Sequence, residues 1–181
     1  SKLIKMLDVL NDESSSMDDE LFVTYFDKEN IAYWMAFQLL TGNTDTQNRN
    51  VYLYSPQNSS KWYLWDWDND GMLRRRERKI INFSDSESWE RGVSNYWGNV
   101  LFRRCLQTQS YRDLLDTAMK ELYAYMNEER IQSMMEHYRR VTEKYVWQMP
   151  DRMNVPITHD EYEEVLKSIW PEIDENYNYY W

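Results

Sequence analysis

The segment from Gly42 to Gly71 constrains the fold most, because it places two strand-like stretches between two loops rich in Asp and Asn. The stretches NVYLYS and KWYLWDW are rich in aromatic and branched residues, and Pro56 to Ser60 lie between them. This pattern predicts a β-hairpin with a five-residue connection. An antiparallel hairpin returns the end of its second strand to the start of its first, so the two acidic loops are expected to meet.

The residues before this hairpin have the periodicity of helices. Residues 1–12 predict a helix with one apolar face, and a Ser-rich acidic connector follows over residues 13–19. Asp27 is a predicted N-cap for the helix KENIAYWMAFQLL, and Gly42 lies just past its end. The apolar face of the first helix consists of Leu3, Ile4, Leu7 and Leu10. The buried stripe of the second consists of Ile31, Trp34, Met35 and Leu39.

From Trp97 the pattern is helical to the end of the chain. Ser110-x-x-Asp113 predicts the start of one helix, Asn127 caps the next, and Thr158-x-x-Glu161 forms a capping box for the last. Pro171 is expected to kink or restart this last helix. The residues of the middle helix that are expected to face inward are Ile131, Met134, Met135, Tyr138 and Val141.

We therefore predict a mainly α fold with one small β-hairpin, as a single domain over residues 1–181. Residues 20–82 carry the acidic loops, and residues 97–181 form a helical bundle. The 181 residues include Asp+Glu 31 against Lys+Arg 21, and a formal net charge of -10 argues against a nucleic-acid partner. No stretch has the roughly 20 apolar residues of a membrane helix. The basic run RRRERK at residues 74–79 is interpreted as a solvated loop end, with phosphate or acidic-peptide binding as the alternative.

Cysteine and histidine limit the other chemistries. Cys105 is the only cysteine, so no intrachain disulfide is possible, and its helical context predicts a small buried side chain. His137 and His159 lie in predicted helices, far along the chain from the acidic loops. Histidine-based metal sites and Ser-His-Asp chemistry are therefore not expected.

The acidic loops have the residue types that phosphoryl transfer requires. That reaction uses one carboxylate to orient the attacking hydroxyl, and an amide with a carboxylate to hold magnesium. Asp45 precedes Asn50 by five positions, and the second strand ends on Asp66 and Asp68, which share one face of an extended strand. Protein kinases use the same order: a catalytic Asp, four residues, a metal-binding Asn, a strand pair and a metal-binding Asp.

The segments FDKENIAYW, GNTDTQNRNVYLY and KWYLWDWD resemble the signature region of the CotH (spore-coat protein H) kinase-like family. NVLFRRCLQTQSYRDLL is similar to the helix pair after that family's site. The resemblance implies the C-terminal lobe of an atypical kinase that uses ATP and Mg²⁺ to phosphorylate Ser or Thr of partner proteins, and it favours a cell-surface or secreted location. By position it implies that Asp45 is the catalytic Asp, that Asn50 and Asp66 are metal ligands, and that Asp68 is an auxiliary acid.

The sequence departs from a complete kinase on the nucleotide side. The chain has only 4 Gly and no Gly-rich loop before Asp45, and no strand Lys with a helical Glu partner is evident. Ser1 opens the chain inside an amphipathic pattern, without Met or a signal peptide, so we expect a piece of a longer protein. The fragment alone is expected to be inactive, and the parent protein to be the phosphotransferase.

An alternative interpretation uses the same acids differently. Residues 66–77, DWDNDGMLRRRE, match the calcium-loop pattern D-x-D-x-D-G-x5-E, with Asp70 and Glu77 as the distinguishing ligands. The chain would then be a non-catalytic interaction module, with Ca²⁺ in the loop and an aromatic, acidic surface for a partner protein or polysaccharide. The remaining loop residues, Asn43, Thr44 and Asn48, are interpreted as turn formers.

Overall fold

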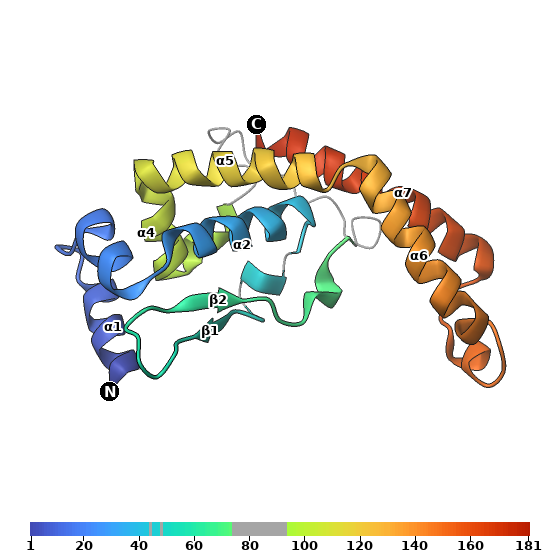
Figure 1. The fold of residues 1–181 in the computed structure, drawn as a ribbon, viewed down its shortest axis with the longest axis horizontal. Coiled ribbons are helices and arrows are strands. Elements are labelled where there is room, and N and C mark those ends of the chain that lie inside the picture. The colour runs from blue at the N-terminus through green and yellow to red at the C-terminus, as the bar shows by residue number, and fades with distance from the viewer. Residues whose placement is uncertain (44, 48, 74–93) are drawn as a thin grey trace.

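Residues 1–43, 45–47, 49–73 and 94–181 are described in a computed structural model of the protein (Figure 1). The fold is mainly helical with one two-stranded antiparallel sheet, as the sequence predicts. The longer elements are α1 (Lys2–Asn11), η1 (Met17–Tyr25), α2 (Lys28–Leu40), β1 (Tyr52–Tyr54), β2 (Tyr63–Trp65), α4 (Val100–Gln107), α5 (Gln109–Tyr125), α6 (Glu128–Val146) and α7 (His159–Tyr180). Short 3-10 turns cover Asp45–Gln47, Asn69–Gly71, Ser94–Gly98 and Asp151–Asn154. The basic run at residues 74–79 lies outside the described residues.

Helix α2 is the centre of the fold, with α5 along one side and the hairpin along the other (Figure 1). Its start is fixed as predicted, because the Asp27 carboxylate accepts a hydrogen bond from the Asn30 backbone N–H at 2.8 Å. Its end is also as predicted, since Gly42 adopts a left-handed φ of 61°. Three residues of the predicted stripe are buried and Leu39 is partly buried. Residues on the opposite side are buried as well, so neighbours cover α2 on most of its circumference. Its buried residues are Ile31, Ala32, Trp34, Met35, Ala36, Gln38 and Leu40.

The hairpin forms where it was predicted, with Leu53 paired to Leu64 at its centre. A two-stranded sheet is marginal by itself and needs a helix to pack against. Leu64 is buried and Leu53 is partly buried against the core, so this face of the hairpin packs on α2. Asn30 of α2 fixes the position of the second strand, because its side chain accepts from the Leu64 N–H at 2.7 Å and donates to the Leu64 carbonyl at 3.2 Å.

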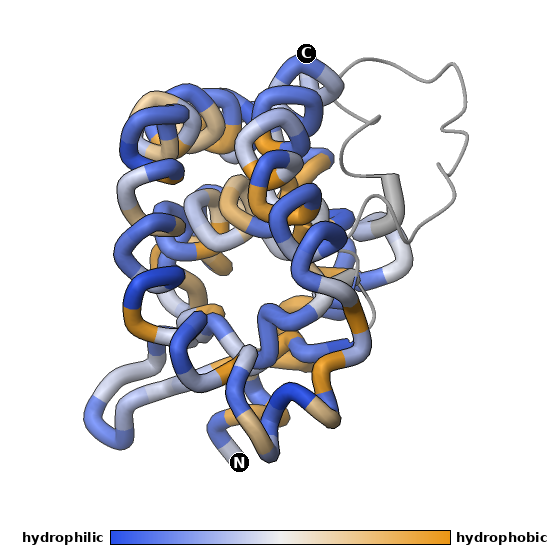
Figure 2. Tube along the Cα trace, turned by 90° about the vertical axis from the view of Figure 1, so that its right-hand side faces the viewer, coloured by the Kyte–Doolittle hydropathy of each residue, from blue (hydrophilic) through white to orange (hydrophobic). Residues whose placement is uncertain are grey.

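Stacked aromatic rings in the core join α2 to α4 and η1 to α5. Trp34 stacks on Phe102 with ring centroids 5.5 Å apart, and Phe22 stacks on the fully buried Tyr111 at 6.1 Å. Cys105 is completely buried as predicted, and burial raises the pKa of its thiol. In Figure 2 the hydrophobic stretches gather between the helices and the hydrophilic ones lie toward the periphery.

Two predictions at the N-terminus are wrong in detail. Helix α1 buries Met6 and Leu10, whereas Leu3, Ile4 and Leu7 of the predicted apolar face are exposed. The predicted connector over residues 13–19 already contains the start of η1, a π-helical segment that begins after the Ser16 cap. The first difference arises because the neighbouring elements decide which face of α1 is covered, and the second because the Ser16 side chain caps a helix inside the predicted connector.

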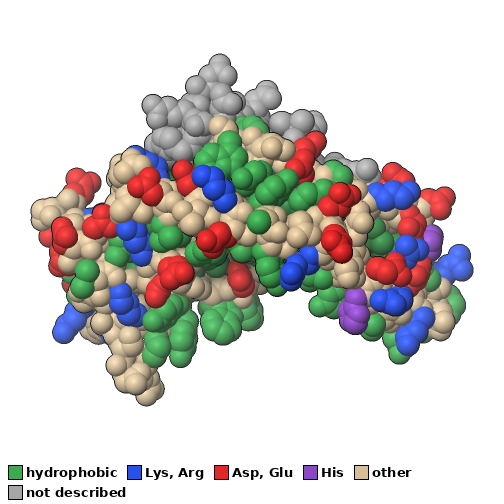
Figure 3. Space-filling model, turned by 45° about the horizontal axis from the view of Figure 1, so that its top comes forward, with side chains coloured by type: hydrophobic (Ala, Val, Ile, Leu, Met, Phe, Trp, Pro, Cys, Tyr) green, Lys and Arg blue, Asp and Glu red, His purple; other side chains and the backbone are tan. Residues whose placement is uncertain are grey.

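Two predictions in the C-terminal half are also wrong. Ser110 lies inside α5 rather than at its start, because Thr108 is the cap residue, and the Ser110 hydroxyl donates to Asp18 instead. Helix α6 begins after Asn127 as predicted, but it buries none of its residues, and Met134, Tyr138 and Val141 are exposed. With the first part of α7 it forms a hairpin that projects from the rest of the molecule (Figure 1). Acidic, basic and histidine side chains lie on the surface of this projecting part (Figure 3).

Helix α7 holds the end of α2 in place. It starts with the predicted Thr158–Glu161 capping box and continues through Pro171 without interruption, so the expected restart does not occur. Further along, the Asn176 side-chain amide donates to the Leu40 carbonyl at 2.9 Å. This contact satisfies a backbone acceptor that the end of α2 leaves open, and it anchors the start of the loop after Gly42. Within the described part of the chain no helix has the length and apolarity to cross a membrane.

Candidate functional site

The two acidic loops meet, as the hairpin predicts. The Asn50 side-chain amide donates to the Asp68 carbonyl at 3.4 Å, and the Leu73 N–H donates to the Thr41 carbonyl at 2.8 Å. These contacts join the loop after α2 to the loop after β2 at both ends. The fold therefore brings together residues that are far apart in sequence but adjacent across the hairpin.

Asp45 lies directly against the second loop. A Cβ atom built on Gly71 would lie 2.8 Å from Asp45 Oδ2 and 2.9 Å from Asn43 Oδ1. Such distances are essentially never seen for real Cβ atoms, so only glycine allows this approach. The Asp45 backbone is held by Asn43, whose side chain accepts from the Asp45 N–H at 3.3 Å. Asp45 is partly buried and begins the short helical turn that continues to Gln47.

A buried network of amide side chains supports Asp66 and the loops. Gln38, 1% exposed, donates to Asp66 Oδ1 at 3.1 Å and to Asn69 Oδ1 at 3.4 Å. Its carbonyl oxygen accepts from the Asn43 amide at 2.9 Å, and Asn43 also donates to Asn69 at 3.2 Å. Buried amides of this kind are costly unless satisfied, and here each one satisfies another. The network therefore fixes the positions of the second strand end and the first loop together.

The loop after α2 is also held by a contact with the hydrophobic core. The buried Thr46 hydroxyl lies 3.0 Å from the Tyr96 hydroxyl and donates to the Asn43 carbonyl at 3.0 Å. Tyr96 in turn packs edge-on against Phe102 of the core, with ring centroids 5.2 Å apart. Two buried residues near Asp45 in sequence, Asn43 and Thr46, are thus held by hydrogen bonds to their neighbours.

Asp66 is an exposed carboxylate at the end of the second strand, and the partner that fixes it is the neutral Gln38. Partial desolvation raises the pKa of the Asp66 carboxyl, although its hydrogen bond from Gln38 acts in the opposite direction. Among the described residues, no Lys or Arg forms an ion pair with this carboxylate. An ionised carboxylate with neutral partners in a partly desolvated place gains free energy when it binds a cation.

The two loops contain the left-handed backbone residues of the described chain. Asn50, Asp68 and Leu73 have φ values of 56°, 52° and 54°, and Gly42 is the glycine with this conformation. Asn and Asp tolerate the left-handed region, whereas for Leu it costs free energy. Strained residues that gather at one place and persist are a feature of functional sites.

The structure brings most of the predicted residues together, but with intervening amides. Asp45 and Asp66 connect through Asn43 and Gln38, and Asn50 reaches the backbone rather than the carboxylate of Asp68. Across the described residues, these carboxylates do not form a group of three with ligand atoms within 4.8 Å. Asp68 is exposed and contributes its backbone carbonyl to the contact.

Sequence reasoning missed Gln38 and Asn69. Gln38 offered a signal, because it is the one uncharged polar side chain in the last two turns of an otherwise apolar helix, immediately before the acidic loop. Asn43 forms the turn that was predicted for it and also belongs to the buried network. Thr44 and Asn48 lie outside the described residues.

The geometry of residues 66–73, the described part of the predicted calcium loop, differs in two respects from that of a calcium loop. Gly71 lacks a left-handed φ, and its small size serves the close approach of Asp45. Asp66 follows a β-strand and accepts a hydrogen bond from Gln38, whereas a calcium loop of this type follows a helix. Glu77, the last ligand of the pattern, lies outside the described residues.

The outer face of the hairpin is aromatic and exposed. Tyr52 packs against Trp67 with ring centroids 5.1 Å apart, and Tyr54 packs against Trp65 at 6.1 Å. All four side chains are more than half exposed, and they alternate with the residues that face α2. We refer to Tyr52, Tyr54, Trp65 and Trp67 as the aromatic face. It borders the acidic loops directly, since Asp66 lies between its two tryptophans.

The sequence matches the family described as CotH kinase protein over residues 1–180. The match covers nearly the whole chain, and the protein therefore belongs to the CotH kinase family. Searches of curated proteins and of solved structures returned no match.

Proposed function

We propose that this chain is the catalytic-lobe part of a kinase-like phosphotransferase that acts on Ser or Thr of a partner protein, in the full-length protein to which it belongs. One observation supports the proposal above the others: the carboxylate of Asp45 is seated against Gly71, inside the loop that follows Asp66. This contact supports the proposal because it brings the candidate catalytic acid to the loop that follows Asp66, one of the candidate metal ligands. Membership of the CotH kinase family agrees with that chemistry.

Among the described residues, Asn50 and Asp66 each keep one side-chain oxygen that these hydrogen bonds do not use, and we propose that these two oxygens bind the metal ion. The Asn50 amide nitrogen donates to the Asp68 carbonyl, which directs the other end of the amide, Oδ1, away from that contact. Gln38 occupies Oδ1 of Asp66, and the second carboxylate oxygen is not used by this bond. Amide and carboxylate oxygens are ligands that Mg²⁺ accepts, so the donor set fits the ion. Asp68 serves as an auxiliary acid at the edge of the site.

The role of Asp45 is to orient the attacking hydroxyl. A carboxylate accepts a hydrogen bond from a Ser or Thr hydroxyl and takes its proton as the new bond forms. Asn43 and Gly71 hold Asp45 from two sides, so the carboxylate reaches the acceptor in a fixed orientation. When bound, ATP would supply the γ-phosphoryl group and leave as ADP once its bond to that group breaks, and Mg²⁺ would neutralise the charge on the phosphate oxygens.

The aromatic face is where we propose that the partner protein contacts this chain. Exposed Tyr and Trp side chains are enriched at protein interfaces, and these four lie next to the acidic loops. A segment bound there would place its hydroxyl side chains near Asp45.

The proposal is tested by ATP-dependent phosphate transfer to protein in the full-length protein, with Asp45→Asn and Asp66→Asn as variants. Both substitutions preserve shape and remove the carboxylate charge, so transfer should fall by about 100-fold or more, as for other catalytic acids. Asp8→Asn, at an exposed position on α1, is the matched control and should leave transfer unchanged. Retention of transfer in both folded site variants would refute the assignment.

The exposed aromatic face also supports the alternative function, a non-catalytic interaction module with Ca²⁺ in the loop after β2. This function predicts that Ca²⁺ raises the melting temperature of the protein and that Asp70→Asn abolishes the rise. A melting temperature that does not respond to Ca²⁺ would exclude the calcium form of the alternative.

A further inference from the structure

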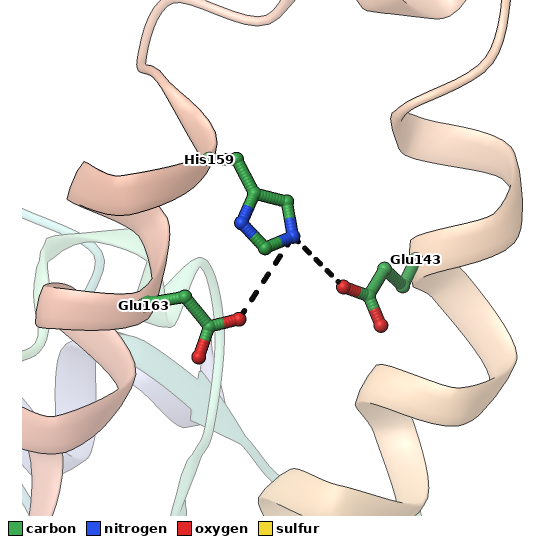
Figure 4. Close-up of side chains that lie close together, drawn as sticks. All are labelled: Glu143, His159 and Glu163. Atoms are coloured by element: carbon green, nitrogen blue, oxygen red, sulfur yellow. Dashed lines mark hydrogen bonds and ion pairs between the residues drawn. The ribbon is translucent and has the colours of Figure 1, made fainter.

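We infer that the hairpin of α6 and α7 carries a separate cation site, in which Glu143, His159 and Glu163 bind a divalent ion such as Zn²⁺. The three side chains converge from two helices, as Figure 4 shows. Glu143 lies in the last turn of α6, and His159 and Glu163 lie one turn apart at the start of α7. Each offers one ligand atom, and these atoms lie within 4.8 Å of one another.

The distances are close to those of a tetrahedral zinc site. His159 Nε2 is 3.1 Å from Glu143 Oε1 and 4.0 Å from Glu163 Oε1. Ligands about 2.1 Å from a tetrahedral zinc ion are separated by about 3.4 Å. Small rotations of partly exposed side chains are therefore enough to bring all three atoms to bonding distance.

The ligand set selects the class of metal. One imidazole with two carboxylates suits Zn²⁺ and the neighbouring transition metals, whereas Mg²⁺ and Ca²⁺ prefer oxygen ligands alone. The site thus differs in chemistry from the acidic loops. It also uses a histidine for which the sequence indicated no metal partner, because Glu143 and His159 meet only through the turn between two helices.

Among the described residues, Arg139 forms the ion pairs with the two carboxylates of this cluster, and its contacts are compatible with metal binding. Its Nε lies 3.3 Å from Glu143 Oε2, which leaves Oε1 directed at the imidazole. Its Nη2 lies 2.6 Å from Glu163 Oε1. The angle of this contact is not that of a hydrogen bond, and the buried oxygen accepts none from the described residues. We expect the metal to displace Arg139 from Glu163, while Arg139 keeps its contact with the outer oxygen of Glu143 and orients that ligand.

The hairpin is a place where a metal ion would contribute stability. Helix α6 buries none of its residues, so the two helices are joined with little apolar burial. A metal ion bound from both helices would link them directly, since its binding free energy adds to the stability of the folded hairpin. A pocket of about 480 Å³, lined by Trp147, Arg152, Ile157, Thr158 and His159, opens beside the imidazole. It provides an entry path and space for a fourth ligand.

The test is a Zn²⁺ titration of the protein by calorimetry, together with its melting temperature with and without Zn²⁺. We expect the wild type to bind one Zn²⁺ ion at this cluster. His159→Gln and Glu163→Gln should each lower the zinc affinity by more than about tenfold, because the loss of a residue that only supports a metal ligand already lowers it by about that much. His137→Gln is the matched control, because His137 is the other histidine of the chain and is exposed on the same hairpin. It should bind Zn²⁺ as tightly as the wild type.

Asp66→Asn separates this site from the acidic loops and should also keep the wild-type zinc affinity. Equal zinc affinity of His159→Gln and the wild type would overturn the inference, as would a wild type that binds no Zn²⁺. Zinc affinity lost in Asp66→Asn but kept in His159→Gln would move the metal to the loops and refute the hairpin site. The zinc test changes His159 and Glu163, whereas the phosphotransfer test changes Asp45 and Asp66. A negative zinc result would therefore not bear on the proposed phosphotransfer.

Discussion

Asp45 and Gly71 are in such close contact that a single added carbon at Gly71 would lie 2.8 Å from the Asp45 carboxylate. Asp45 lies in the loop after α2 and Gly71 in the loop after β2. Their contact therefore joins the two loops that form the candidate site. Gln38 fixes the same two loops from beneath through Asn43 and Asp66. The site is therefore preorganised by packing as well as by hydrogen bonds.

Gly71→Ala should displace Asp45 and lower phosphate transfer in the full-length protein by about 100-fold, the cost of a misplacement of about 1 Å. Overpacking should also lower the free energy of unfolding by about 1–3 kcal/mol. Gly98→Ala is the control, since a Cβ there meets no atom within 4 Å. The measurements are transfer rates and urea unfolding. Equal behaviour of the two alanine variants would show that the Asp45 contact is unimportant.

Gln38→Leu should destabilise the protein by about 2 kcal/mol or more, because each buried polar group left unsatisfied costs about 1–3 kcal/mol. Asn43, Asn69 and Asp66 would all lose their partner on α2. Gln132→Leu removes an exposed amide on α6 and should change the free energy of unfolding by less than about 0.5 kcal/mol. Urea unfolding measures both, and a small effect at Gln38 would contradict the buried network.

Asp66→Asn should make the protein more stable at neutral pH. The pKa of Asp66 is raised in the folded state, so the ionised carboxylate opposes folding at pH values above that pKa. Asn keeps the acceptor for Gln38 and removes the charge. The advantage of the variant should disappear as the pH falls through the folded pKa, which lies above the ordinary value of 3.8. Urea unfolding of both proteins over the acidic range checks this, and a variant less stable at neutral pH would contradict it.

Arg104→Lys should lower the free energy of unfolding by about 2–3 kcal/mol, because hydrogen bonds from charged donors contribute about 1.5–3 kcal/mol and lysine cannot reproduce the planar fork. The Arg104 guanidinium donates to the carbonyls of Val9, Leu10 and Asp12 at the end of α1, and to Ser15 beyond it. Arg103→Lys is the control, since Arg103 donates only to the Trp97 carbonyl in the described part of the chain. Similar melting temperatures for the two variants would refute the role of Arg104.

The sequence by itself determined the features whose signals are local. The caps at Asp27, Asn127 and Thr158, the left-handed Gly42 and the hairpin all depend on residues within a few positions of one another, and all are present. The hairpin also carried the main prediction about the site, because strand pairing returns one loop to the other whatever surrounds them. The resemblance to the family was strongest in the same segment, and the family match extends over residues 1–180.

Only the tertiary structure decided which faces are covered and which polar groups meet. Helix α1 buries Met6 instead of Leu3 and Ile4, and α6 leaves Met134 and Tyr138 exposed. Burial depends on which element packs against a helix, and the apolar periodicity of the helix does not specify that element. Gln38 reaches Asp66 from 28 positions away, and Glu143 reaches His159 from 16. Such contacts depend on how helices cross and strands dock, and that information is spread over the whole chain.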